Sequence, residues 1–172
     1  MCALRSVKSF LGVFPSDLLP RSIPQHDSTV IIYADPHTKS GSHWLAIRFE
    51  PGSSKAFYFD SFGQQPHITN IQDFLRSNST VKEYNTVRLQ GPTTTLCGKY
   101  CCLFAFHMYR GFSRKHFVSL FDPSVADGMV KHLFIFVFGR LVKICGGKSC
   151  TSANNRCHIS LLKGDLQSCT SF

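Results

Sequence analysis

The segment QGPTTTLCGKYCC (90–102) decides how the rest of the chain is interpreted. Polar and turn-forming residues lead to Cys97, and an almost wholly apolar run follows, which predicts a buried helix over 97–111. The amino terminus of a helix lowers the pKa of a thiol through its dipole and its free N–H groups. Cys97 is therefore a candidate nucleophile, whereas Cys101 and Cys102, one turn further along, are expected to fill the core.

A thiolate nucleophile needs an imidazole partner, and the chain offers one next to a predicted hairpin. The alternating runs WLAIRFE (44–50) and KAFYFDSF (55–62) read as two antiparallel strands joined by PGSS. His43 precedes the first strand, and Asp60 ends the second. Because the start of one strand lies beside the end of the next, both side chains should meet at one end of the hairpin. The pair then supplies a base and the carboxylate that orients it.

Gln90 ends a predicted strand over 84–91 that leads into the cysteine loop. Its side-chain amide, with the backbone N–H of Cys97, would stabilise the negative charge of an oxyanion. Taken alone, each candidate has a commoner structural explanation: a buried thiol, a turn-forming aspartate or a solvated amide. Their combination favours a cysteine-dependent hydrolase site.

The remaining periodicity predicts an α+β domain with a central antiparallel-rich sheet and the buried, nucleophile-bearing helix packed on it. A buried strand is expected over 28–35 and a helix over 68–78. The first 25 residues read as a short helix followed by a turn-rich stretch. A last helix is expected to start with Asp122 as its N-cap and to run toward Val142.

Length and charge narrow the class of protein. The chain has 172 residues and a formal net charge of +9, enough length for one domain with its own core. The basic residues are scattered, so we expect only weak, secondary DNA binding. We find neither a signal peptide nor a membrane span, and we expect an intracellular protein, nuclear or cytoplasmic, with reduced thiols.

Three segments in order, SGSHWLAI, YFDSFG and QGPTTTLCGKYCC, resemble the adenovirus-type cysteine endopeptidases (adenain). That family is related to the SUMO-deconjugating Ulp/SENP-like proteases, and the similarity covers about residues 8–112. The resemblance implies a papain-like cysteine protease that cleaves after Gly, at Gly-Gly or Gly-x-Gly, in proteins of a virus or virus-like mobile element. It also implies roles for four residues: His43 as base and acid, Asp60 as its orienter, Gln90 as oxyanion donor and Cys97 as nucleophile.

The chain departs from that family's pattern in two places. Asp60 stands where the viral enzymes carry Glu, and either carboxylate can orient an imidazole. The viral enzymes bind a peptide activator through a disulfide to a cysteine shortly before the QGP block, but SNSTVKEYNTVRL (77–89) contains no cysteine. We therefore expect a monomer that acts on polypeptides, with no activator held by that disulfide, and with a virion as one location.

Residues 1–145 are interpreted as the adenain-like domain and 146–172 as a Ser-, Gly- and Cys-rich tail. The cysteines from 145 onward, in the pattern C-x4-C-x6-C-x11-C, fit no compact zinc site, so no metal and no cofactor is expected. Three alternatives stay open: an isopeptidase for ubiquitin-like proteins, an inactive nucleic-acid-binding relic of the fold, and a zinc-binding adaptor built on the tail.

Overall fold

The computed structural model describes residues 9–24, 27–39, 42–50 and 52–139. Its centre is a five-stranded mixed sheet in the order β1-β2-β3-β4-β5. The central pairs β2–β3 and β3–β4 are antiparallel, and the two edge pairs are parallel. The predicted α+β class with an antiparallel sheet centre is confirmed. The strands are β1 (Phe10–Pro15), β2 (Ser28–Tyr33), β3 (Trp44–Phe49), β4 (Lys55–Phe59) and β5 (Val81–Tyr84).

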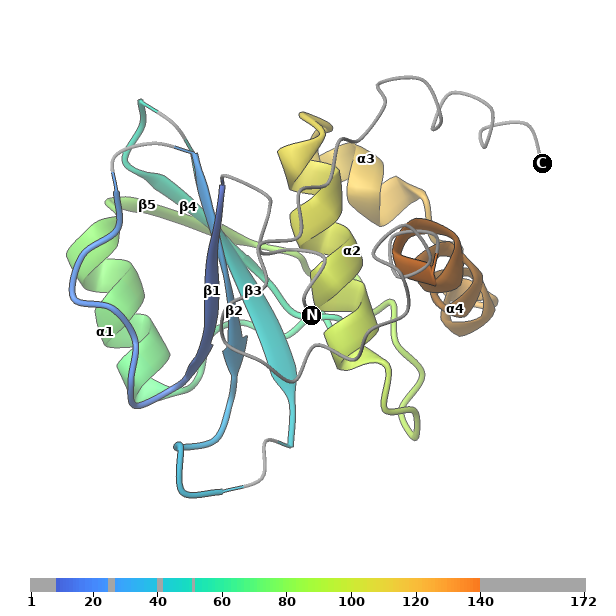
Figure 1. The fold of residues 1–172 in the computed structure, drawn as a ribbon, viewed down its shortest axis with the longest axis horizontal. Coiled ribbons are helices and arrows are strands. Elements are labelled where there is room, and N and C mark those ends of the chain that lie inside the picture. Colours follow the sequence, from blue (N-terminus) through green and yellow to red (C-terminus); the bar gives the residue numbers. More distant parts are fainter. Residues whose placement is uncertain (1–8, 25–26, 40–41, 51, 140–172) are drawn as a thin grey trace.

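Helices cover both faces of the sheet, so the fold has three layers (Figure 1). Helix α1 (Thr69–Asn78) covers one face alone. Helix α2 (Cys97–Tyr109) packs on the other face, with α3 (Arg114–Ser119) and α4 (Ala126–Phe134) outside it. A π-helical turn, Ile135–Gly139, continues α4. None of the helices in the described ranges is long and apolar enough to span a bilayer.

Alternate residues of the central strands feed two separate cores, as the two-residue period of a strand requires. Ile31 and Ala46 face α2, whereas Ile32 and Leu45 face α1, and all four are fully buried. The central strands are therefore apolar on both sides.

Helix α2 is the most buried helix of the described chain, as its sequence predicts. Its Phe104 ring stacks on Phe59 of β4, with ring centroids 4.7 Å apart. The helix ends where Gly111 takes a φ of +81°, a left-handed conformation that favours glycine. Cys101 and Cys102 lie in this core, so the expectation for both thiols is confirmed.

Two predictions about the amino-terminal and central segments are wrong. Within the first 25 residues, for which only a short helix and a turn-rich stretch were predicted, residues 10–15 form β1, because they pair in parallel with the edge of β2; residues 1–8 lie outside the described residues. The strand expected over 84–91 ends at Tyr84, since β5 occupies Val81–Tyr84. Beyond it, the Asn85 side chain binds the backbone of Asp60 and of Val87, and these side-chain bonds take the place of strand pairing.

The start predicted for the last helix lies too early in the chain. Asp122 caps a turn by accepting hydrogen bonds from Ser124, and α4 begins only at Ala126. The short helix α3 was not predicted, although Ser113 caps it by accepting from the His116 N–H. The continuation toward Val142, the domain boundary at 145 and the tail lie outside the described residues.

The attachment of α1 gives the first testable prediction. Leu75 of α1 is 1% exposed, whereas Leu18, in the loop after β1, is 54% exposed. We expect Leu75→Ala to lower the free energy of unfolding by about 2–5 kcal/mol, because it leaves a cavity beneath the sheet. The matched variant Leu18→Ala should change it by less than about 0.5 kcal/mol. Urea unfolding measures both, and equal effects would contradict the core assignment.

Candidate active site

The β3–β4 hairpin brings His43 and Asp60 together, as predicted. The register pairs Ala46 with Phe59, so the residue before β3 lies beside the residues that follow β4. The His43 Nε2 atom lies 2.8 Å from Asp60 Oδ1, and the Asp60 side chain is fully buried. A buried carboxylate in direct contact with an imidazole fixes the ring and its tautomer. Because Nε2 faces Asp60, Nδ1 is the nitrogen left for another partner.

Backbone and side-chain contacts hold Asp60 in place. Its Oδ1 atom also accepts from the Phe62 N–H at 2.8 Å. The Asn85 side chain binds both backbone polar groups of Asp60. It accepts from the Asp60 N–H at 2.9 Å and donates to the Asp60 carbonyl at 2.6 Å. The Phe62 ring stacks on His43 with centroids 5.0 Å apart. The imidazole is thus fixed at its edge and on its face.

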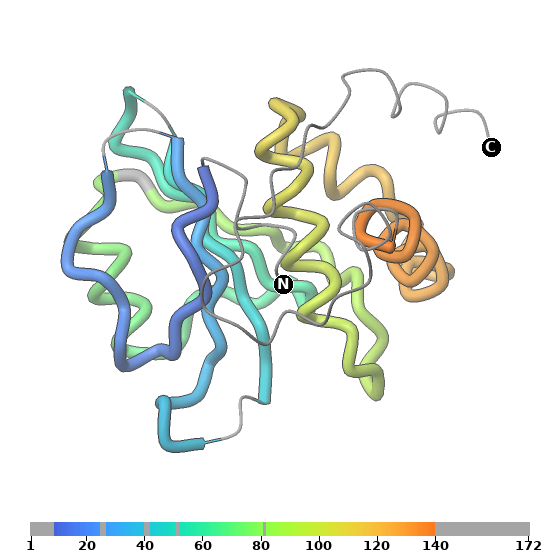
Figure 2. The backbone as a smooth tube through the Cα atoms, viewed as in Figure 1, coloured from blue at the N-terminus to red at the C-terminus, as the bar shows by residue number. Residues whose placement is uncertain are grey.

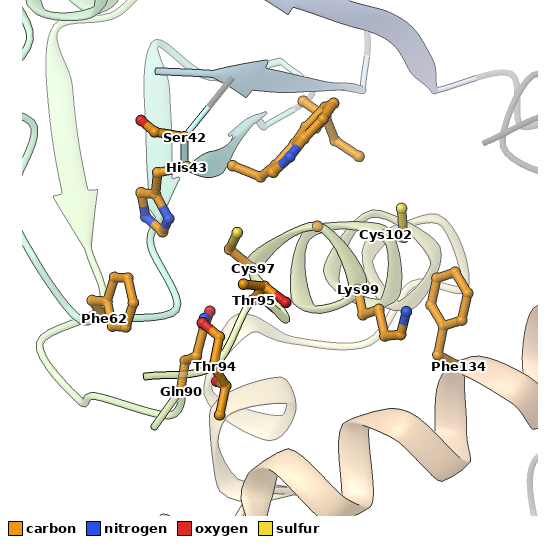
Figure 3. Close-up of a pocket in the computed structure, with 13 residues that line it drawn as sticks. Ser42, His43, Phe62, Gln90, Thr94, Thr95, Cys97, Lys99, Cys102 and Phe134 are labelled. Carbon is orange, nitrogen blue, oxygen red and sulfur yellow. The ribbon is translucent and has the colours of Figure 1, made fainter. Parts of the chain in front are cut away.

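Cys97 is the first residue of α2 and faces His43 (Figure 3). Burial disfavours its thiolate, but hydrogen bonds from the His43 ring and from the Trp44 backbone N–H outweigh burial and lower the pKa of Cys97. The same core raises the pKa of Cys102 to about 11 through burial, and that of Cys101 well above its ordinary value. Of these three thiols, only Cys97 is activated.

His43 carries the complementary charge. Burial disfavours the imidazolium, but the hydrogen bonds with Asp60 and Cys97 outweigh burial and raise the pKa of His43 from 6.5 to about 9. The pKa of Cys97 moves down and that of His43 moves up, so the contact between the two groups favours transfer of the thiol proton to the imidazole. The resulting thiolate–imidazolium pair combines a nucleophile with a proton donor.

Gln90 lies in the loop that leads from β5 to Cys97, which Figure 2 traces into the start of α2. Its Oε1 atom accepts from the Ser61 hydroxyl at 2.7 Å, and its Nε2 atom donates to the Thr94 carbonyl at 2.5 Å. A carbonyl can only accept, so this contact settles the amide orientation. One N–H of the amide is used in this way, and Gln90 lines the same cleft as Cys97.

The cleft has a volume of about 490 Å³ and contains all the candidate groups except the buried Asp60. A Cβ atom added at Gly98 would meet the Trp44 indole at 3.7 Å, so the indole lies against the first turn of α2. The lining residues are Ile31, Ser42, His43, Trp44, Phe62, Gln90, Thr94, Thr95, Cys97, Gly98, Lys99, Cys102 and Phe134. Within the described part of the chain, no cluster of His, Cys, Asp and Glu could hold a metal ion.

Asp127 of α4 ties the cysteine loop to the outer helix. Its Oδ2 atom accepts from the Gly91 N–H at 3.2 Å, and its Oδ1 atom accepts from the Tyr100 hydroxyl at 3.0 Å. The sequence interpretation missed this residue, together with Ser61 and Asn85. Ser61 adjoins Asp60, and this adjacency was an available signal; Asn85 and Asp127 carry no local signal because they act across 25 and 36 residues.

The thiolate–imidazolium pair predicts how Cys97 reacts with iodoacetamide. Alkylation should begin below the ordinary thiol pKa of about 8.5, because the pKa of Cys97 is lowered. In His43→Ala, the onset should move up toward that ordinary value. Rates as a function of pH, with the labelled peptide identified by mass spectrometry, measure this. An unchanged onset in His43→Ala, or labelling of folded Cys101, would contradict the assignment.

Substitutions at Gly91 and Asp127 should have coupled effects on the free energy of unfolding. A Cβ atom at Gly91 would lie 2.8 Å from Asp127 Oδ2, so Gly91→Ala should cost about 1–3 kcal/mol of unfolding free energy. In the Asp127→Ala background that cost should shrink, because the colliding oxygen is gone. Gly128→Ala is the control: nothing lies within 4 Å of its Cβ position, and α4 should gain about 0.5–1 kcal/mol. Strict additivity of the first two variants would refute the contact.

Comparison with known protein sequences points to one family. The family model for the adenovirus endoprotease matches residues 10–122, a range that includes His43, Asp60, Gln90 and Cys97. The protease of Porcine adenovirus A serotype 3 is 32% identical over 119 residues, covering 58% of this chain and 57% of that protein. The protease of Bovine adenovirus 4 is 28% identical over 141 residues, covering 70% and 68%.

The protease of Bovine adenovirus 2 is 29% identical over 107 residues, covering 55% of this chain and 52% of that protein, so the chain spans about half the length of that relative. Among solved structures, the crystal structure of the ASFV pS273R protease is similar at a TM-score of 0.44 and 23% identity, covering 55% of this chain and 37% of that one. The family match extends over more than half of the chain and includes the whole cleft except for its α4 wall. The chain therefore belongs to the adenovirus endoprotease family.

Proposed function

We propose that the protein is a cysteine endopeptidase that cleaves peptide bonds after glycine. The observation that carries the proposal is the 2.8 Å contact between His43 Nε2 and the buried Asp60, beside a thiol whose pKa is lowered. A structural cysteine has no need of an oriented imidazole. A hydrolase needs the imidazole in order to form the ion pair and to protonate the leaving amine.

The reaction follows from the positions of these groups. The Cys97 thiolate attacks the scissile carbonyl carbon, and the remaining N–H of the Gln90 amide and the backbone N–H of Cys97 stabilise the oxyanion. Collapse of this intermediate breaks the C–N bond, and His43 gives its proton to the departing amine. Water then attacks the thioester, His43 takes the proton of that water, and the thiolate is regenerated.

The preference for glycine is supported by the shape of the cleft beside the nucleophile. Gly98 follows Cys97, and the Trp44 indole lies against it. A substrate chain that reaches Cys97 alongside this indole and Gly98 has little room for large side chains next to the cleaved bond. Substrates of this kind are proposed to be structural proteins of a virus or virus-like element, and the basic net charge supports DNA as a secondary partner.

Steady-state cleavage of a fluorogenic peptide containing Gly-Gly tests the proposal. Cys97→Ala should abolish cleavage, and Gln90→Ala should lower kcat about 10²–10³-fold with little change in KM, because its amide acts on the oxyanion. Activity should fall above about pH 9, where His43 loses its proton. Cys101→Ala is the matched control and should retain activity, since that thiol is buried in the core.

Equal cleavage by the wild type and Cys97→Ala would refute the proposal. The same enzyme preparations should be given an isopeptide-linked ubiquitin-like conjugate that ends in Gly-Gly. Cleavage of the conjugate with no cleavage of the peptide would instead identify the chain as a deconjugating isopeptidase.

A further inference from the structure

Lys99 is a charged residue of the cleft that the proposed mechanism does not use. It lies in the first turn of α2, and Phe134 of α4 lies next to it in the cleft wall. The Lys99 ammonium lies 4.8 Å from the centroid of the Phe134 ring. Figure 3 shows the Lys99 side chain pointing toward this ring. Phe134 lies outside residues 10–122, the segment that the family model matches.

The position of Lys99 is unfavourable for the helix itself. The amino-terminal turn of a helix carries partial positive charge, so a cation there typically costs a few tenths of a kcal/mol or more. The first turn of α2 contains no acidic residue. Among the described residues, the ion pairs involve other cations, and the partner recorded for Lys99 is the Phe134 ring. No carboxylate of the described residues forms an ion pair with Lys99, so its positive charge is available to a ligand in the cleft.

The direction of the substrate chain decides which part of it meets Lys99. In the proposed reaction His43 protonates the leaving amine, so the leaving chain lies toward His43 and Phe62. Figure 3 shows Cys97 between these residues and Lys99. The acyl chain, which ends at the cleaved carbonyl, then runs the other way, past Gly98 and toward Lys99.

We propose that Lys99 is a specificity residue that selects substrates with an aspartate or glutamate upstream of the small residues at the cleavage site. An acidic side chain there meets a cation already held against Phe134, so less side-chain freedom is lost on binding. The Phe134 ring shields one side of the ammonium from water, which strengthens its attraction for a carboxylate. This inference rests on the proposed direction of cleavage and adds a substrate class to it: acidic peptides.

A peptide series tests the inference. Each member carries Gly-Gly before the cleaved bond and Glu, Gln or Lys at one of the three preceding positions. At one position the wild type should prefer Glu over Gln by about 3- to 10-fold in kcat/KM, the range of a partly exposed charge pair. Raising the salt from about 50 to 500 mM should shrink the preference, because added ions screen the attraction.

Lys99→Gln should bring the Glu/Gln ratio close to one, and Lys99→Glu should reverse it in favour of Lys peptides. The matched control is Lys115→Gln on the exposed surface of α3, which removes the same charge outside the cleft and should leave the ratio unchanged. An equal loss in Lys115→Gln would show a general charge effect and overturn the assignment to Lys99.

A binding measurement separates this inference from the proposed function. Fluorescent acyl-side peptides that end in Gly-Gly are titrated against Cys97→Ala, with and without Lys99→Gln, and fluorescence anisotropy gives Kd. A Glu preference that depends on Lys99 supports the inference even if no peptide is cleaved, in which case only the proposed function fails. Cleavage and binding with no Glu preference at any position would overturn the inference and leave the proposed function intact.

Discussion

The contact between His43 and Asp60 is the constraint on which the rest of the site depends. It joins the residue before β3 to the residue after β4, so its geometry is inherited from the register of the hairpin. A one-residue slip of that register would turn the side chains of one strand to the other face of the sheet. The two cores that flank the sheet oppose such a slip, because it would expose one apolar set and bury polar atoms. The register of the hairpin thus determines both the packing of the two cores and the orientation of the His43 imidazole.

The loop that precedes Cys97 is not itself part of a strand or helix, so contacts from other parts of the fold hold it. Its backbone is bound by groups that follow β4: the Ser61 carbonyl accepts from the N–H groups of both Leu89 and Gln90. On its outer side Asp127 accepts from the Gly91 N–H. The loop is therefore fixed between the hairpin and α4, and Gln90 acquires a defined orientation from neighbours distant in sequence. A buried amide in such a network is rigid because each alternative orientation would break a hydrogen bond.

These two parts differ in how well the sequence predicts them. The hairpin and α2 follow from local patterns, alternation in one case and an apolar run in the other, and both His43–Asp60 and the start of α2 at Cys97 were predicted. The strand over 84–91 was not found, because the Asn85 side chain replaces backbone pairing there. The start of α4 was misplaced because Asp122 caps a turn, a role that its residue type equally allows. Contacts across the chain, such as that of Asp127, leave no local pattern.

The three cysteines of α2 show why position decides chemistry where residue type cannot. Cys97 stands at the amino terminus, within reach of the His43 ring and of the backbone N–H groups of Trp44 and Gly98, and its pKa falls despite burial. Cys101 lies one turn deeper, where burial, and then the neighbouring Cys102, Cys97 and Asp60, raise the pKa of its thiol. A single helical turn therefore separates a nucleophile from a core residue of the same type. The first turn also holds Lys99, and its positive charge gives that end of the helix a potential that suits anions at the nucleophile and in the cleft alike.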